Sequence, residues 1–435
     1  MYSRKPAATV IRQPLILTKE HAAAFILITA VFFNAALAIE NGHLHQLSQI
    51  YVSLAEAVIT GLAVLLVAVN FRTDMLPWAV LLVFILLLHL VLSFVNQAVN
   101  PKIIRDVIDI PVFIALGMVY ARGNIVKLFF YIQTIVLAVL LMELIDVDTY
   151  SQIFKIQDYY MNTREITQHA FWNTDSTLFV SATRPGERFL LDFLGIHRLS
   201  SVFLEPVSLG NYGIVATIFT LAFWREMSRW MKFFFVISTV CIVIGCDGRL
   251  AAVSCAILVI CAPIFPLLPR YSNLTFLPGV FFFSALAVGL LALRHSTDDF
   301  VGRLSGSIDL LGGLDLGAIF GLDPLLAAKA SDSGISYFVL TQSVIGVAVM
   351  WIFICLVPRY RTRISVILIY SICTYVPLNL LVSYSLFSIK TAAPMWFMYG
   401  YLTAETTLRR TAPRQNRRLP IGMMPVTYGA VEGRR

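Results

Sequence analysis

Charged residues are scarce in this chain. Only 13% of its 435 residues are Asp, Glu, Lys or Arg, whereas 58% are hydrophobic. A soluble domain carries roughly 25% charged residues, so this chain lacks the charge needed to cover a water-facing surface of its size. The composition excludes a soluble domain and indicates that lipid is the solvent for most of the chain.

Cysteine is also rare, and its positions exclude two kinds of site. The six cysteines all lie inside apolar runs, with neither CxxC nor Cys/His spacing: Cys241, Cys246, Cys255, Cys261, Cys355 and Cys373. This pattern predicts small core residues rather than a disulfide framework or a metal site. No cofactor is expected. The net charge of +8 lies in short loops and at the end of the chain, which indicates membrane topology rather than nucleic-acid binding.

Long apolar runs are abundant. At about 20 apolar residues per span, they predict about twelve transmembrane helices, the first of them uncleaved. The expected runs are Ala22–Ile39, Tyr51–Asn70, Leu76–Gln97, Asp106–Tyr120, Ile125–Glu143, Val202–Trp224, Trp230–Gly245, Leu250–Leu268, Leu274–Leu293, Ser336–Leu356, Ile364–Ser385 and Thr391–Thr407. Pro377 and Lys390 interrupt the pattern near its end, so the number is approximate.

The basic residues predict the orientation. With the N-terminus in the cytoplasm, alternation of the spans puts three basic groups on the cytoplasmic side: Arg225, Arg229 and Lys232; Arg359, Arg361 and Arg363; and seven arginines from Arg409 onward. The positive-inside rule favours this arrangement. We therefore expect one all-α integral membrane domain over residues 1–435, with both termini cytoplasmic and a basic tail over about 408–435.

Two long segments, about 145–201 and 294–335, fall on the external side. Long polar connections on one side of a helix bundle are typical of a functional face. Aromatic residues are frequent in the first of them: Tyr150, Phe154, Tyr159, Tyr160, Phe171, Trp172 and Phe179. They either stack on sugar rings or form the core of the loop, and the second alternative is favoured.

The stretch from Arg198 to Asn211 is the most informative. An arginine stands at the external mouth of a span, and Glu205 with Pro206 follows about two turns later. An ionisable residue inside a span is costly and indicates a functional site. The alternative is an interfacial carboxylate that reaches water or pairs with an arginine. Pro206 loosens the backbone, which is tolerated where protein or a water-filled cavity covers it.

Further arginines are predicted on the same face. The turn Gly245–Arg249 places Arg249 at the start of a span, unless it simply pairs with Asp247. The second long segment contains Arg303 together with His295 and Asp332, beside a glycine-rich apolar stretch. Because the arginine fork suits phosphate oxygens, the cluster predicts a phosphorylated lipid ligand; solvated loop residues are the alternative. Four other polar residues in spans form no spaced relay: Glu56, His89, Asp109 and Glu143.

These motifs resemble a known superfamily. Arg198…Phe203-Leu-Glu-Pro…Gly210 is similar to the arginine-led helix entry of O-antigen ligases and Wzy-type polysaccharide polymerases. Asp247-Gly-Arg249 is similar to the Ser-x-x-Arg-Gly turn of that family, although Asp and Gly depart from it. Asp332-Ser-Gly…Tyr337 with Gly346 resembles the segment that closes the large periplasmic loop. The resemblance covers roughly residues 195–350, and the Glu-Pro pair is most like xanthan-type exopolysaccharide polymerases.

The resemblance implies a reaction and a location. A growing glycan on undecaprenyl diphosphate would be transferred to a hydroxyl of a new lipid-linked repeat, at the periplasmic face of the bacterial inner membrane. Arg198, Arg249 and Arg303 would bind the diphosphate, so that no metal is needed. Glu205, His295 and Asp332 are the candidates for a base or a sugar-orienting group. His295 stands at the start of its loop, away from the position of the family's histidine. A membrane protein that regulates chain length would be a partner.

Three alternatives stay open. A flippase or transporter of lipid-linked oligosaccharides would have a similar number of helices, but it should show repeat symmetry and broken helices. An O-antigen-type ligase differs mainly in its acceptor. A membrane acyltransferase would need a catalytic histidine with a partner, and His89 has none in the sequence pattern. Polar features on one face favour an enzyme.

Overall fold

The computed structural model describes residues 18–164, 166–167, 177–182, 190, 197–290, 300–330, 333–360 and 362–411. Within these ranges every regular element is a helix and no strand occurs. Nine helical segments of this described part are long and apolar enough to cross a membrane. They contain α1 (Lys19–His43), α2 (Gln49–Val69), α3 (Leu76–Asn96), α5 (Ile125–Ile145), α8 (Pro206–Phe223), α9 (Arg229–Cys246), α11 (Phe276–Leu290), α14 (Gly334–Leu356) and α15 (Arg363–Val382). The chain is thus an all-α, multi-pass membrane protein.

Three further helices coincide with the remaining expected spans. They are α4 (Pro101–Val119), α10 (Arg249–Cys261) and α16 (Ile389–Thr411). α4 carries Arg105, Asp106 and Asp109 in its first turns, and α10 has only 13 residues. The number of about twelve spans therefore stays a prediction.

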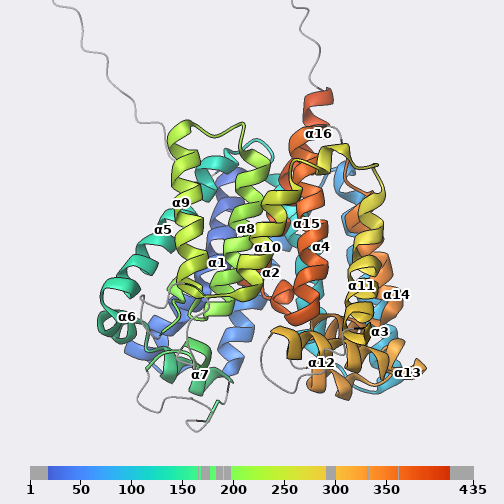
Figure 1. Ribbon diagram of the computed structural model, residues 1–435, viewed down its shortest axis with the longest axis horizontal. Coiled ribbons are helices and arrows are strands. Elements are labelled where there is room, and N and C mark those ends of the chain that lie inside the picture. Colours follow the sequence, from blue (N-terminus) through green and yellow to red (C-terminus); the bar gives the residue numbers. More distant parts are fainter. Residues whose placement is uncertain are drawn as a thin grey trace, which may run out of the picture.

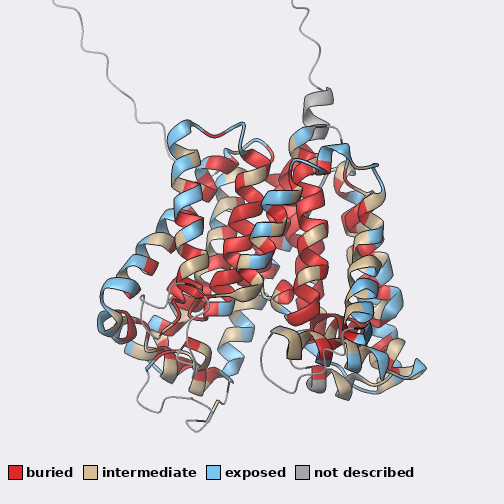
Figure 2. Ribbon diagram, in the orientation of Figure 1, coloured by how far each residue is buried: buried red, intermediate tan, exposed pale blue. Residues whose placement is uncertain are grey.

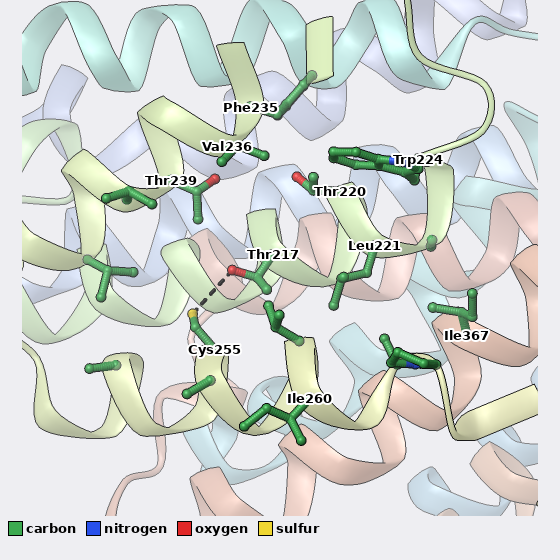
Figure 3. A pocket seen from close by; sticks show the side chains of 18 of the residues that line it. Thr217, Thr220, Leu221, Trp224, Phe235, Val236, Thr239, Cys255, Ile260 and Ile367 are labelled. Carbon is green, nitrogen blue, oxygen red and sulfur yellow. Dashed lines mark hydrogen bonds between the residues drawn. The ribbon is translucent and has the colours of Figure 1, made fainter. Parts of the chain in front are cut away.

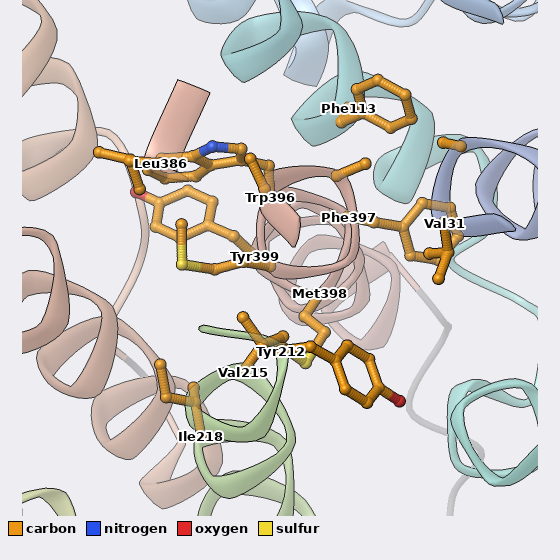
Figure 4. Close-up of a cluster of buried hydrophobic side chains, with 14 of the residues drawn as sticks. Val31, Phe113, Tyr212, Val215, Ile218, Leu386, Trp396, Phe397, Met398 and Tyr399 are labelled. Atoms are coloured by element: carbon orange, nitrogen blue, oxygen red, sulfur yellow. The ribbon is translucent and has the colours of Figure 1, made fainter. Parts of the chain in front are cut away.

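Helix α16 lies at the centre of the bundle, against α4 and also against α1 and α8 (Figure 1). Its Trp396, Phe397, Met398 and Tyr399 are all at most 1% exposed. In Figure 4 these side chains lie among Phe113 of α4 and residues of α1 and α8. Figure 2 shows the same concentration of buried residues along the middle of the bundle. Other helices, rather than lipid, therefore surround α16 and can supply partners for the lysine in its first turn.

The prolines do not interrupt the last two helices. α15 continues through Pro377 to Val382, and α16 continues through Pro394. The sequence pattern indicated an interruption at Pro377, and this was wrong for the helix itself. Neighbouring helices in a membrane bundle can satisfy the backbone groups that a proline frees.

The outer helices present apolar faces. On α2 and α3, Leu65 is 61% exposed and Phe94 is 84% exposed, together with many other large apolar side chains. Continuous apolar exposure of this extent is unusual on a soluble monomer. It is the expected outer surface of a bundle that contacts lipid tails.

The described parts of both long segments lie at one end of the bundle, the lower end in Figure 1. The first contains α6 (Val147–Phe154) and α7 (Ile156–Arg164), and the second contains α12 (Phe300–Gly312) and α13 (Leu316–Ile319). Four aromatic residues of the first are at most 4% exposed: Tyr150, Phe154, Tyr159 and Tyr160. They form part of the core, as favoured above, whereas Phe171 and Trp172 lie outside the described residues.

Candidate active site

A tight turn leads into α8 and positions Glu205. Ser201 has φ +50° and Leu204 has φ +62°, in the left-handed region that non-glycine residues rarely adopt. Glu205 is extended and Pro206 is the first residue of α8, where its fixed φ and missing N–H suit a helix start. The chain therefore reverses sharply just before the helix and leaves Glu205 at the helix entry.

Buried polar groups brace this turn. The carboxylate of Glu143, at the end of α5, accepts hydrogen bonds from the backbone N–H groups of Ser200 (3.0 and 2.9 Å) and Ser201 (2.7 Å). The Tyr150 hydroxyl donates to the carbonyl of Ser201 at 2.6 Å. Glu143 is 0% exposed. It had no assigned role in the sequence, and the structure shows that it fixes the left-handed backbone before α8.

Glu205 joins two positively charged groups. Its Oε1 lies 2.5 Å from Nη2 of Arg164, at the end of α7, and its Oε2 lies 3.1 Å from Nζ of Lys390, in the first turn of α16. Ser208 donates to Oε2 at 2.7 Å, and Lys390 also donates to the carbonyl of Phe203 at 3.1 Å. We call Arg164, Glu205, Ser208 and Lys390 the Glu205 cluster. Glu205 thus pairs with an arginine, as one interpretation of the sequence expected, and also with a lysine.

The exposure of the side chains in the Glu205 cluster increases from Lys390, in the interior, to Arg164, at the surface. Lys390 is 2% exposed and Glu205 9%, whereas the side chain of Arg164 is 47% exposed. Its guanidinium lies 4.6 Å from the ring centre of Tyr160 and 5.9 Å from that of Phe179. α7 in turn packs on α1 and α2, and the Tyr159 hydroxyl donates to Asn34 at 2.9 Å. Arg164 is thus a cation held in place at the exposed edge of the Glu205 cluster.

The electrostatics keep Glu205 ionised. Burial of Glu205, which lies just before α8, would raise the pKa of its carboxyl, but the charges of Arg164 and Lys390 outweigh burial and hold this pKa well below its usual range. A general base works best with a pKa near the operating pH. Glu205 is therefore suited to positioning the two cations and poorly suited to accepting a proton.

A second charged cluster lies close by. Arg105 of α4 pairs with Glu56 of α2 and, at 2.8 Å, with its neighbour Asp106. The hydroxyl of Tyr337, in the first turn of α14, donates to Asp106 at 2.8 Å. We call Glu56, Arg105, Asp106 and Tyr337 the Arg105 cluster. Lys390 interacts electrostatically with Glu56, which links the two clusters.

Other polar residues of the spans find local partners. Asp109 accepts from Thr60 at 2.8 Å, and His89 lies 2.8 Å from the Gln342 side chain. These contacts join neighbouring helices. His89 and Asp109 thus have structural partners. The sequence indicated no relay among the polar residues of the spans, and these contacts are local ones.

The structure brings only some of the predicted site residues together. Arg198 is 7% exposed, and its guanidinium donates to the carbonyls of Cys246 (2.9 Å) and Ser181 (3.3 Å). It therefore ties the entry of α8 to the turn before Arg249, the first residue of α10. In that turn Asp247 accepts from the backbone N–H of Leu190 at 2.7 Å.

The remaining predicted residues belong to the second long segment. Arg303 lies on α12, one turn from Ser307, whose hydroxyl donates to the carbonyl of Leu381 in α15. Partly exposed Arg303 thus shares the end of the bundle that carries the Glu205 cluster. His295 and Asp332 lie outside the described residues.

Sequence reasoning missed the two cations beside Glu205. Lys390 was noted only as an interruption of an apolar run, and Arg164 was not singled out. Lys390 stands directly before the expected span Thr391–Thr407, and an ionisable residue at the edge of a span is a functional-site signal, so Lys390 was detectable. Arg164 carried no comparable signal.

No protein-family model matches the chain, and neither the curated proteins nor the solved structures searched contain a match. Within the described ranges, no group of three or more His, Cys, Asp or Glu side chains has a geometry suited to a metal ion.

The brace at Glu143 gives a first prediction. Glu143→Ala leaves two buried backbone N–H groups without their acceptor, so we expect the free energy of unfolding to fall by about 2 kcal/mol or more. Thermal unfolding in detergent measures this. The control is Glu40→Ala, because Glu40 is a partly exposed carboxylate whose contact is with His45 at 3.4 Å. Equal stability of the two variants would contradict the bracing role.

Proposed function

We propose that this protein is a metal-independent membrane glycosyltransferase that polymerises lipid-linked oligosaccharide repeats in bacterial exopolysaccharide biosynthesis. The observation that carries the proposal is the Glu205 cluster, a buried carboxylate that holds Arg164 and Lys390 at the end of the bundle where α7 and α12 lie. The motif resemblance around Glu205 supports the same function.

The reaction needs positive charge at the leaving group. The acceptor hydroxyl oxygen forms a bond to the anomeric carbon of the donor, and the bond between that carbon and the diphosphate oxygen breaks. The electron pair leaves with undecaprenyl diphosphate, and the hydroxyl proton passes to a base. Fixed donors aimed at the developing charge stabilise such a step.

Arg164 is the best placed donor for this charge. Its guanidinium carries five N–H donors, and the contact with Glu205 involves one nitrogen, Nη2. The half-exposed side chain is held by two aromatic rings and a carboxylate, so little conformational entropy is lost when a diphosphate binds. Arg198, by contrast, points its guanidinium at backbone carbonyls. We therefore place Arg164 ahead of Arg198 as the diphosphate ligand, with Arg249 and Arg303 as further candidates. Lys390 is 2% exposed and bonded to Glu205, so its part is to hold that carboxylate in position.

The membrane face follows from the same proposal. The end that carries α6, α7, α12 and α13 would be periplasmic, in the inner membrane, and the opposite end cytoplasmic. Arg225 and Arg363 lie at that opposite end, as the positive-inside rule requires.

The test uses the host with the gene deleted, complemented at matched membrane levels with wild type, Arg164→Ala or Arg164→Lys. We expect Arg164→Ala to reduce polymer by about 100-fold or more, while single repeats accumulate on the lipid carrier at the periplasmic face. Arg164→Lys should restore polymer only partly, because lysine lacks the planar fork.

The matched control is Arg270→Ala. Arg270 also lies over two aromatic rings, those of Tyr271 (5.2 Å) and Tyr360 (5.7 Å), but it stands in the connection between α10 and α11. It should keep wild-type polymer. Repeats trapped on the cytoplasmic side would favour a flippase, and normal polymer that is not joined to its final acceptor would favour a ligase.

A further inference from the structure

A lateral cleft lies between α9 and α10, with α8 as its floor and α15 at one end (Figure 3). Its volume is about 900 Å³, at the upper end of the range of roughly 300–1,000 Å³ for ligand pockets. In Figure 3, Val236 and Thr239 of α9 face Cys255 and Ile260 of α10 across it. The cleft opens outward, because Val240 is 48% and Ile260 68% exposed.

The walls of the cleft suit hydrocarbon. The Thr217 hydroxyl donates to the carbonyl of Gly213 at 2.9 Å, and the Thr220 hydroxyl donates to that of Ala216 at 2.7 Å. Both bonds lie within α8, and the Thr217 oxygen also lies 3.2 Å from Cys255 Sγ of α10, so both hydroxyls already have partners within the protein. Most of the other lining side chains are aliphatic or aromatic. A ligand inside it is therefore an apolar chain.

One end of the cleft carries positive charge. Arg225, in the turn after α8, and Arg363, the first residue of α15, both line it and are exposed. Trp224 beside them is 44% exposed, and Nζ of Lys232 lies 5.3 Å from its ring centre. Tryptophan with basic residues at the end of spans is typical of the headgroup level of a membrane. The acidic neighbour Glu226 lines a different pocket.

We propose that this cleft binds one anionic phospholipid. An acyl chain of the lipid would lie between α9 and α10, and its phosphate would lie at Arg225 and Arg363. Basic sites between spans on the cytoplasmic side are suited to anionic headgroups. The arginines stand at the end of the bundle opposite α7 and α12, so a polyisoprenyl diphosphate bound at the Glu205 cluster would not put its phosphates there. The site does not depend on the proposed function.

The experiment measures lipid retained by the purified full-length protein. Detergent-solubilised protein is incubated with phosphatidylglycerol or phosphatidylcholine, washed, and analysed by native mass spectrometry. We expect one retained phosphatidylglycerol, preferred over phosphatidylcholine, and an approximately tenfold loss of retention in Arg225→Ala/Arg363→Ala. Arg225→Lys/Arg363→Lys should keep most of the binding, because it keeps both charges. That result would show that the alanine variant loses lipid through loss of charge and not through misfolding.

The matched control is Arg122→Ala/Arg229→Ala, which removes two exposed arginines from the same end of the bundle without touching the cleft. It should retain phosphatidylglycerol like the wild type. Unchanged retention in Arg225→Ala/Arg363→Ala, equal retention of both lipids, or displacement of the bound lipid by a polyisoprenyl phosphate would each overturn the proposal.

Discussion

Replacing Glu205 by glutamine is expected to lower the free energy of unfolding by about 3–5 kcal/mol, because removal of one partner leaves a buried charge uncompensated. Lys390 is 2% exposed, and Glu205 is its partner at 3.1 Å. Glutamine keeps the volume and one oxygen, so packing is unchanged and the loss reports the charge. Thermal unfolding in detergent, with wild type in parallel, measures it.

The double variant Glu205→Gln/Lys390→Met separates stability from function. With both charges of the buried pair removed, stability should recover most of the loss, because replacing a buried pair by neutral groups is often nearly neutral. Polymer formation should stay lost in the double variant, since Arg164 no longer has the carboxylate that holds it in place. A double variant that is stable and fully active would show that the pair has no catalytic part, and a double variant no more stable than Glu205→Gln would contradict the pairing.

Gly400→Ala is expected to destabilise the bundle by about 3 kcal/mol or more, the upper range for overpacking. A Cβ at Gly400 would lie 1.8 Å from the carbonyl oxygen of Ile114, and a Cβ at Gly117 would lie 2.0 Å from that of Phe397. These neighbours are backbone atoms of the facing helix, so α4 and α16 would have to move apart. Small residues that allow close backbone approach are typical of helix contacts in membranes.

Gly61→Ala provides the matched control. Gly61 is also inside a helix, α2, and a Cβ there meets nothing within 4 Å. The same substitution should leave the protein as stable as wild type or slightly more stable, because alanine favours the helix over glycine. The yield of folded protein and its unfolding temperature in detergent compare the two variants. Similar values for Gly400→Ala and Gly61→Ala would contradict the close packing of α4 on α16.

The candidate site was only partly predictable. The stretch Arg198–Glu205 identified the entry of α8, because a carboxylate and a proline at the mouth of an apolar run are conspicuous in a sequence. Arg164 and Lys390 stand 41 and 185 residues away from Glu205, and no local pattern pairs residues at such separations. The role of Arg198 illustrates the same limit, since its two backbone acceptors lie 17 and 48 residues away.

By itself the sequence determined the class of protein and the positions of most of its helices. Each apolar run satisfies its own backbone hydrogen bonds as a helix, so lipid solvation and helix formation depend on residues that are adjacent in the chain. The pairing of charges was decided only by the tertiary structure, as was the central place of α4 and α16. Charged residues such as Arg105 and Lys390 are stable inside the bundle only with partners from other helices, and the close approach at Gly117 and Gly400 exists only when two helices meet.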